Sequence, residues 1–268
     1  MPMDSTKEGN VITELCRDVA LPRMVKVRQS FDAAHIPRDD IPGALRERLG
    51  RPEILDAIKP GMRVAITAGS RGVANIDVIT KAVVEFVKQR GASPFVFPAM
   101  GSHGGARADG QRQVIASYGI TEESMGCPIR ATMETVQIGS LDDGMPVYMD
   151  KYAHEADAVI LVGRIKAHTA FRGRFESGLI KMSVIGMGKQ RGAETVHESG
   201  FGKISELLPR VAKVVLDNTN VVAAVGIIEN ASGRFRDRGR GHRGGRQELG
   251  KFGAHLQGYP RGILQGVP

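Results

Sequence analysis

The sequence contains few of the residues that cross-linked folds and base-stacking surfaces need. Of its 268 residues, two are cysteine, none is tryptophan and 5% are aromatic. Cys16 and Cys127 alone cannot form a disulfide framework or a cysteine-rich zinc module. The low aromatic content argues against a surface that stacks nucleic-acid bases. We therefore expect a protein of a reducing compartment, with the cytoplasm as its location.

Long apolar runs are also absent. No stretch reaches the length of about 20 residues that a membrane-spanning helix needs, and the polar residues 1–10 lack the apolar centre of a signal peptide. With 41% hydrophobic and 25% charged residues, the composition is that of an ordinary globular protein. We expect no association with a membrane.

The net charge of +8 is concentrated at one end of the chain. Residues 232–268 hold eight Arg or Lys, two acidic residues and ten glycines, which leaves a net charge of only +2 for the rest. Such a segment cannot bury enough apolar surface to offset its ordering entropy. We expect residues 1–231 to form the folded domain, and 232–268 to be a disordered basic tail or an artefact of the gene end. Contact with nucleic acid is expected only weakly, through this tail.

Between Arg63 and Glu229, short apolar runs alternate with helical patterns, which favours an α/β fold with a mostly parallel sheet flanked by helices. Strands are expected at 63–68, 93–97, 136–138, 146–149, 158–162 and 221–228. Helices are expected between Asn75, as a capping residue, and Gly91, and at 109–118 and 203–217. Before residue 60, helical patterns in 41–58 are interrupted at 50–52, and 24–27 is a weaker strand candidate.

Three glycine-containing loops each follow a predicted strand, at 68–72, 100–105 and 163–169. Ligands of open parallel sheets bind beyond the carboxyl ends of the strands, and glycine lets the backbone approach a ligand closely. The loops carry side chains that can bind anions or transfer protons: Arg71, His103, Lys166 and His168. We expect the loops to converge on one site.

Several single residues have both a functional and a plain interpretation. His103 and His168 could exchange protons near neutral pH, or could only hydrogen-bond a loop backbone. Lys181 lies among apolar residues that would make its amine more nucleophilic, but its stem could equally pack there with the charge in water. His197 could bind a metal together with non-protein donors, or lie on the surface. The run from Gly186 to Gly192 lacks the spacing of a dinucleotide fingerprint.

Several segments together resemble the amino-terminal domain of the nickel-dependent lactate racemase family over roughly residues 20–231. They are Phe97-Pro-Ala-Met-Gly-Ser-His-Gly-Gly105, Tyr118-Gly-Ile-Thr-Glu-Glu123, Arg164-Ile-Lys-Ala-His-Thr169, and Glu176-Ser-Gly-Leu-Ile-Lys-Met182 followed by Gly188-Lys-Gln-Arg-Gly-Ala193. The resemblance implies the fold of that domain. It also implies the family's cofactor, a nickel-pincer nucleotide, which is a pyridinium mononucleotide whose thiocarbonyl arms hold nickel.

The resemblance assigns a role to each candidate residue. Lys181 would attach the cofactor and His197 would complete the nickel coordination. Arg71 would contact the cofactor phosphate, with Ser102 and Lys166 assisting in binding the nucleotide or a carboxylate.

The remaining pair would carry out the acid-base chemistry. His103 and His168 would exchange the hydroxyl proton of a 2-hydroxy acid from opposite sides, while the cofactor ring takes and returns hydride. The implied activity is that of an isomerase, a racemase or epimerase, with the small hydroxy acid and the cofactor-biosynthesis proteins as partners.

Three departures from the family pattern affect this expectation, and one of them is a longer spacing from His168 to Lys181. An acidic residue precedes the loop arginine in the lactate racemases, where this chain has Ala68-Gly-Ser-Arg71. A second domain follows in the family, so the chain would be a form lacking it. The alternative function is a non-catalytic α/β protein that binds a nucleotide or another phosphorylated ligand.

Overall fold

The computed structural model describes residues 17–20, 24–26, 28, 35–168 and 175–230 of the 268. The chain divides into two compact units, Met1–Phe31 and Asp32–Pro268. In the first unit, residues 24–26 belong to no helix or strand, so the strand expected at 24–27 is wrong there; Val27 lies outside the described residues. The tail predicted at 232–268 also lies outside them.

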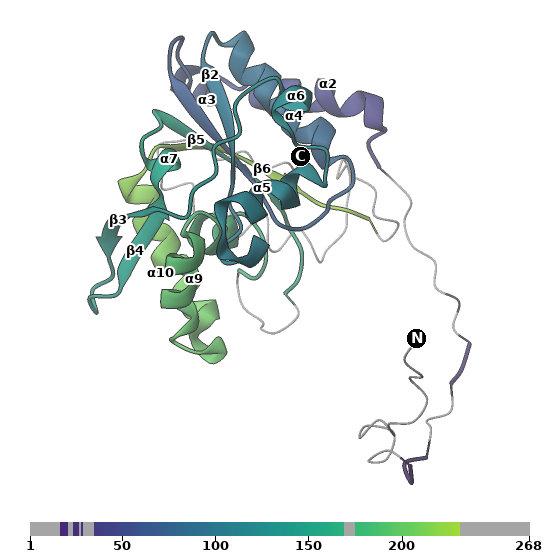
Figure 1. Cartoon of the computed structure of the whole chain (residues 1–268). Helices are drawn as coiled ribbons and strands as arrows, with labels where there is room; N and C mark the ends of the chain where they lie inside the picture. The colour runs from purple at the N-terminus through teal and green to yellow at the C-terminus, as the bar shows by residue number, and fades with distance from the viewer. Residues whose placement is uncertain (1–16, 21–23, 27, 29–34, 169–174, 231–268) are drawn as a thin grey trace, which may run out of the picture. The chain divides into compact units, whose positions relative to one another are not determined.

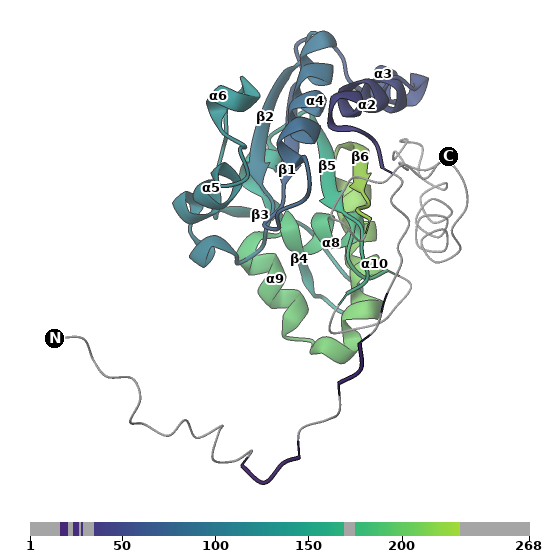
Figure 2. The same ribbon diagram turned by 90° about the vertical axis from the view of Figure 1, so that its right-hand side faces the viewer.

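The second unit, drawn in Figure 1, is built on a parallel sheet of four strands in the order β2-β1-β5-β6, and all four are labelled in Figure 2. Its strands are β1 Arg63–Ala68, β2 Ser93–Pro98, β5 Ala158–Arg164 and β6 Val221–Ile227. Apart from strand ends, their residues are buried, because helices cover both faces. The strands β3 Thr135–Ser140 and β4 Pro146–Asp150 pair separately as an antiparallel hairpin. All six strands occur where the sequence predicts them.

One face of the sheet packs against helices from the first half of this unit (Figure 2). They are α2 Ile41–Leu49, α3 Pro52–Ala57, α4 Ile76–Gln89, α5 Ala108–Ala116 and α6 Glu122–Met125. Successive side chains of a strand point to opposite faces of the sheet. Val64 and Ile66 of β1 therefore belong to the core on this face, while Ala65 belongs to the core on the opposite face.

The other face packs against the hairpin and the later helices. These helices are α7 Lys151–His154, α8 Leu179–Lys181, α9 Lys189–His197 and α10 Phe201–Asn218. Three short helices complete the described elements: η1 Arg38–Asp40, η2 Gly104–Ala106 and the π-helical turn η3 Met182–Gly186. None of the helices described is both long and apolar enough to cross a membrane. The predicted α/β class is confirmed.

The capping role expected of Asn75 is only partly confirmed. Asn75 occupies the position before α4, but its side chain makes no capping bond and its φ is 58°. Its amide oxygen instead accepts a hydrogen bond from Arg38 Nη1 at 2.7 Å. Asparagine tolerates the left-handed backbone better than most residues, so the turn is kept while the side chain is used elsewhere.

The order of the strands reverses direction between β1 and β5. The chain runs from β1 through α4 to β2 on one side, and later returns to place β5 on the other side of β1. Loops that leave two such neighbouring strands diverge, and this crevice is where open α/β sheets bind ligands. The loops predicted at 68–72 and 163–169 start at these two strands.

Candidate active site

The first two predicted loops are joined by a hydrogen bond between their side chains. His103 Nδ1, after β2, forms a short hydrogen bond with Ser70 Oγ, after β1. Tyr118 Oη donates a hydrogen bond of 2.9 Å to the carbonyl oxygen of Ser70. The bond to Ser70 fixes the orientation of the imidazole and leaves Nε2 as the ring nitrogen that can face a ligand.

The third loop is held by the segment that leads into α8. Lys166 N and Ser177 N each donate to the other residue's carbonyl oxygen, at 3.1 and 3.3 Å. His168 N donates to Glu176 Oε2 at 2.6 Å. These contacts lie on either side of residues 169–174, which are outside the described part. They bring the side chain of Lys181 to that of His168, with Nζ 2.8 Å from Nε2.

The amine of Lys181 lies in an environment that disfavours its charged form. Half-burial and the positive charges of Lys166 and Arg71 all lower the pKa of Lys181. A lysine with a lowered pKa has more of its amine in the neutral, nucleophilic form at neutral pH. At its carboxyl end α8 continues directly into the π-helical turn η3, a distortion that is frequent at functional sites.

Two histidines also respond to this cluster of positive charge. Desolvation and the charges of Arg71 and Lys181 lower the pKa of His103, and desolvation and Lys181 lower the pKa of His197. Both residues are nevertheless exposed to solvent. Both rings therefore favour the neutral form, which can accept a proton or bind a metal.

The structure thus gathers most of the residues that the sequence singles out around one amine. His168 contacts Lys181 directly, and His103, His197, Arg71 and Lys166 are near enough to interact with it electrostatically. Ser102 is exposed in the loop beside His103. Among the residues described, no group of three or more His, Cys, Asp or Glu could hold a metal ion.

Two further sets of side-chain contacts support these loops and are not apparent from the sequence pattern. Glu229, at the end of β6, accepts from Ala74 N at 2.8 Å and pairs with Arg164 Nε at 2.7 Å. It thereby connects the loop after β1 with the end of β5. Strand periodicity ends before Glu229, so the sequence carries no signal for this contact.

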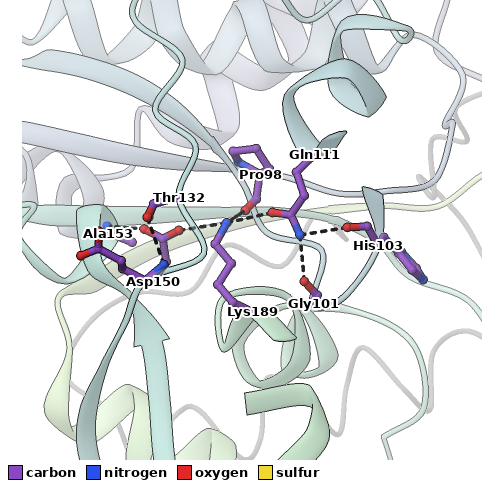
Figure 3. Close-up of polar contacts among 9 residues, drawn as sticks. Pro98, Gly101, His103, Gln111, Thr132, Asp150, Ala153 and Lys189 are labelled. Carbon is purple, nitrogen blue, oxygen red and sulfur yellow. Dashed lines mark hydrogen bonds and ion pairs between the residues drawn. The ribbon is translucent and has the colours of Figure 1, made fainter. Parts of the chain in front are cut away.

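The second is a buried ion pair between Lys189 and Asp150, whose side chains are both fully buried and whose Nζ and Oδ2 are 3.0 Å apart (Figure 3). Burial lowers the pKa of Lys189 and raises that of Asp150. Lysine and aspartate are ordinarily exposed, so only the setting of Lys189 between two glycines, in Gly188-Lys-Gln-Arg-Gly192, marks it in the sequence.

Comparison with known families and structures defines the class to which the chain belongs. The family model of the lactate racemase N-terminal domain matches residues 18–206. The chain is a member of this family.

A solved structure of similar fold is the lactate racemase apoprotein from Thermoanaerobacterium thermosaccharolyticum, with a TM-score of 0.55 and 16% identity. The match covers 78% of this chain and 52% of that one, so this chain spans about half the length of the racemase. The likeness confirms the fold. No curated protein matches the chain.

Proposed function

We propose that the chain is the cofactor-holding domain of an isomerase, a racemase or epimerase of a 2-hydroxy acid that uses a nickel-pincer nucleotide. The observation that carries this proposal is the amine of Lys181, with its lowered pKa, 2.8 Å from His168 and within electrostatic reach of His103 and His197. Family membership supports this reaction class. The cytoplasm, where the cofactor-biosynthesis proteins would meet the chain, is the location we infer.

The residues present fit such a cofactor. Lys181 offers a half-buried amine suited to covalent attachment, and His197 offers an exposed imidazole as a nickel ligand. The remaining donors would come from the cofactor arms. Arg71, Lys166 and Ser102 are exposed at the same loops and would bind the phosphate of the nucleotide or the carboxylate of the substrate.

When bound, the cofactor supplies a ring carbon that accepts hydride from the substrate and returns it. The protein's part is to move the hydroxyl proton, and two bases are needed because hydride leaves one face of the carbon and returns to the other. His103 would use Nε2, since Ser70 holds Nδ1. His168 Nε2 contacts the amine of Lys181, and attachment of that amine to the cofactor would release Nε2 for the substrate.

The test is to express the chain in cells that make the cofactor and to measure intact mass and nickel content. We expect an added cofactor mass with nickel in the wild type and in K203A, a control that removes an exposed lysine of α10. K181A should carry neither. An adduct that persists in K181A would contradict the assignment of Lys181.

The second candidate function is binding of a nucleotide or another phosphorylated ligand without catalysis. The positive charges of Arg71, Lys166 and Lys181 at one edge of the sheet favour it, because their mutual repulsion lowers the pKa of Lys181 and an anion would relieve it. This candidate predicts that a nucleoside monophosphate binds without nickel and that K181A weakens binding but does not abolish it. Calorimetry on the nickel-free chain separates the two.

A further inference from the structure

A buried network of side chains runs beneath the loop that carries His103 (Figure 3). It starts at Asp150 of the hairpin, which pairs with Lys189. Lys189 Nζ also donates to the carbonyl oxygen of Pro98 at 2.5 Å and to Gln111 Oε1 at 3.0 Å. The ammonium group therefore joins β4, the end of β2 and α5 at a single point.

Gln111 of α5 extends the network to the loop. Its fully buried side chain donates from Nε2 to the carbonyl oxygens of Gly101 at 2.8 Å and of His103 at 3.1 Å. An ammonium group can only donate hydrogen bonds, whereas an amide has one accepting and one donating end. Lys189 thus dictates that Oε1 faces it, and the amide's N–H groups consequently point at the loop.

The loop has little freedom to move away from this support. Gly101 and Gly104 have φ values of +58° and +67°, and a Cβ on Gly104 would lie 2.6 Å from the backbone nitrogen of Gln111. A Cβ on Gly110 would collide with the carbonyl oxygen of Gly104. The backbone of the loop therefore rests directly on α5, with Gln111 bonded to it on both sides of Ser102.

The network exists at an energetic cost, which points to a purpose other than stability. Lys189 has a φ of +56°, a conformation that non-glycine residues rarely adopt. Its buried charge must be removed from water, and the attraction of an ion pair often does not exceed that penalty. An apolar residue here would avoid the cost of burying a charge, but it could not orient the amide of Gln111.

We propose that Lys189 and Gln111 are positioning residues that hold the His103 loop so that Nδ1 meets Ser70 and Nε2 faces the site. The inference rests on the proposed function only in giving His103 its role in proton transfer. The positioning itself can be measured on the chain without cofactor or substrate.

The test compares the reactivity of His103 toward diethyl pyrocarbonate with that of His154, an exposed histidine of α7 that serves as an internal reference. Q111M removes both bonds to the loop and adds no charge. We expect the His103:His154 rate ratio to rise by at least about fivefold, because the loss of even one ordinary hydrogen bond allows a change in population of that size. Peptide mass spectrometry reads both sites in one sample.

Two controls separate positioning from general loosening of the fold. Q113M makes the same substitution on an exposed residue of the same helix. L49A removes a fully buried side chain of α2 and should lower stability without touching either loop. Both should keep the wild-type ratio. A folded Q111M with an unchanged ratio, or an L49A that raises the ratio equally, would overturn the proposal.

A measurement on the wild type keeps the proposal testable if Q111M does not fold. Both side-chain amide protons of Gln111 should be protected from hydrogen exchange, and rapid exchange would refute the network. Failure of the proposed function would give a different result. The wild type would then carry no cofactor mass, while Q111M would still raise the His103:His154 rate ratio. In a loaded enzyme, Q111M should lower turnover at unchanged cofactor content.

Discussion

Replacing Lys189 by methionine should destabilise the protein far more than the loss of an ordinary lysine. K189M leaves the carboxylate of Asp150 buried, with Oδ2 deprived of the ammonium group 3.0 Å away. Breaking a buried pair from one side costs about 3–5 kcal/mol. Because domains of this kind have total stabilities of about 5–15 kcal/mol, the variant should be marginally folded.

The structure also indicates which second substitution should restore stability. Asp150 Oδ1 accepts a hydrogen bond from Ala153 N at 3.0 Å, and asparagine can keep that bond. D150N combined with K189M therefore removes the uncompensated charge without losing the turn into α7. The double variant should be more stable than K189M alone, so that the two effects are strongly non-additive.

Urea denaturation with linear extrapolation measures each free energy of unfolding. K213M is the matched control, because Lys213 pairs with Asp217 at 2.6 Å on the surface of α10, where such pairs contribute about 0–1 kcal/mol. If K189M proves as mild as K213M, or if adding D150N lowers stability further, the account of this ion pair is wrong.

Three shorter predictions concern titration and support of the loops. The pKa values of His103 and His197 are lowered in the folded chain, so protonation favours unfolding. The free energy of unfolding should be highest above pH about 6.5 and fall below it. Measured by urea denaturation at a series of pH values, this fall with decreasing pH should be shallower in H103Q/H197Q. The lowered pKa of Lys181 predicts faster acetylation by trace acetic anhydride at neutral pH than at exposed Lys203; equal rates would contradict it. E229Q weakens the contacts of Glu229 with Ala74 N and Arg164. It should lower the free energy of unfolding by about 1–3 kcal/mol, which thermal unfolding can detect.

The strands and long helices could be predicted because one physical signal dominates in each. The run at 158–162 is apolar and β-branched, and β5 is buried on both faces. The helical spacing of apolar residues after Asn75 matches the buried face of α4. The convergence of the loops followed from a general property of parallel sheets, which needs only the order of the elements.

The supporting contacts could not be predicted, because they depend on pairs distant in the sequence. Lys189 and Asp150 are 39 positions apart, as the numbering shows, and neither residue type indicates burial by itself. Asparagine is a residue type that commonly caps helices, yet the side chain of Asn75 accepts a hydrogen bond from Arg38 instead. In each case, tertiary partners decide between conformations that the local sequence leaves equally open.

The position of the site between β1 and β5 also has a consequence for folding. Ser70 and His103 lie in loops that follow the neighbouring strands β1 and β2, but His168 reaches them only after β5 has paired with β1 across about ninety residues of chain. Contacts of such long sequence separation form slowly, since loop closure precedes the stabilisation that they bring. The cluster of imidazole and positively charged side chains around Lys181 should therefore assemble late and as a unit. A substitution that slows the docking of β5 would delay the arrival of functional protein even where the final structure is unchanged.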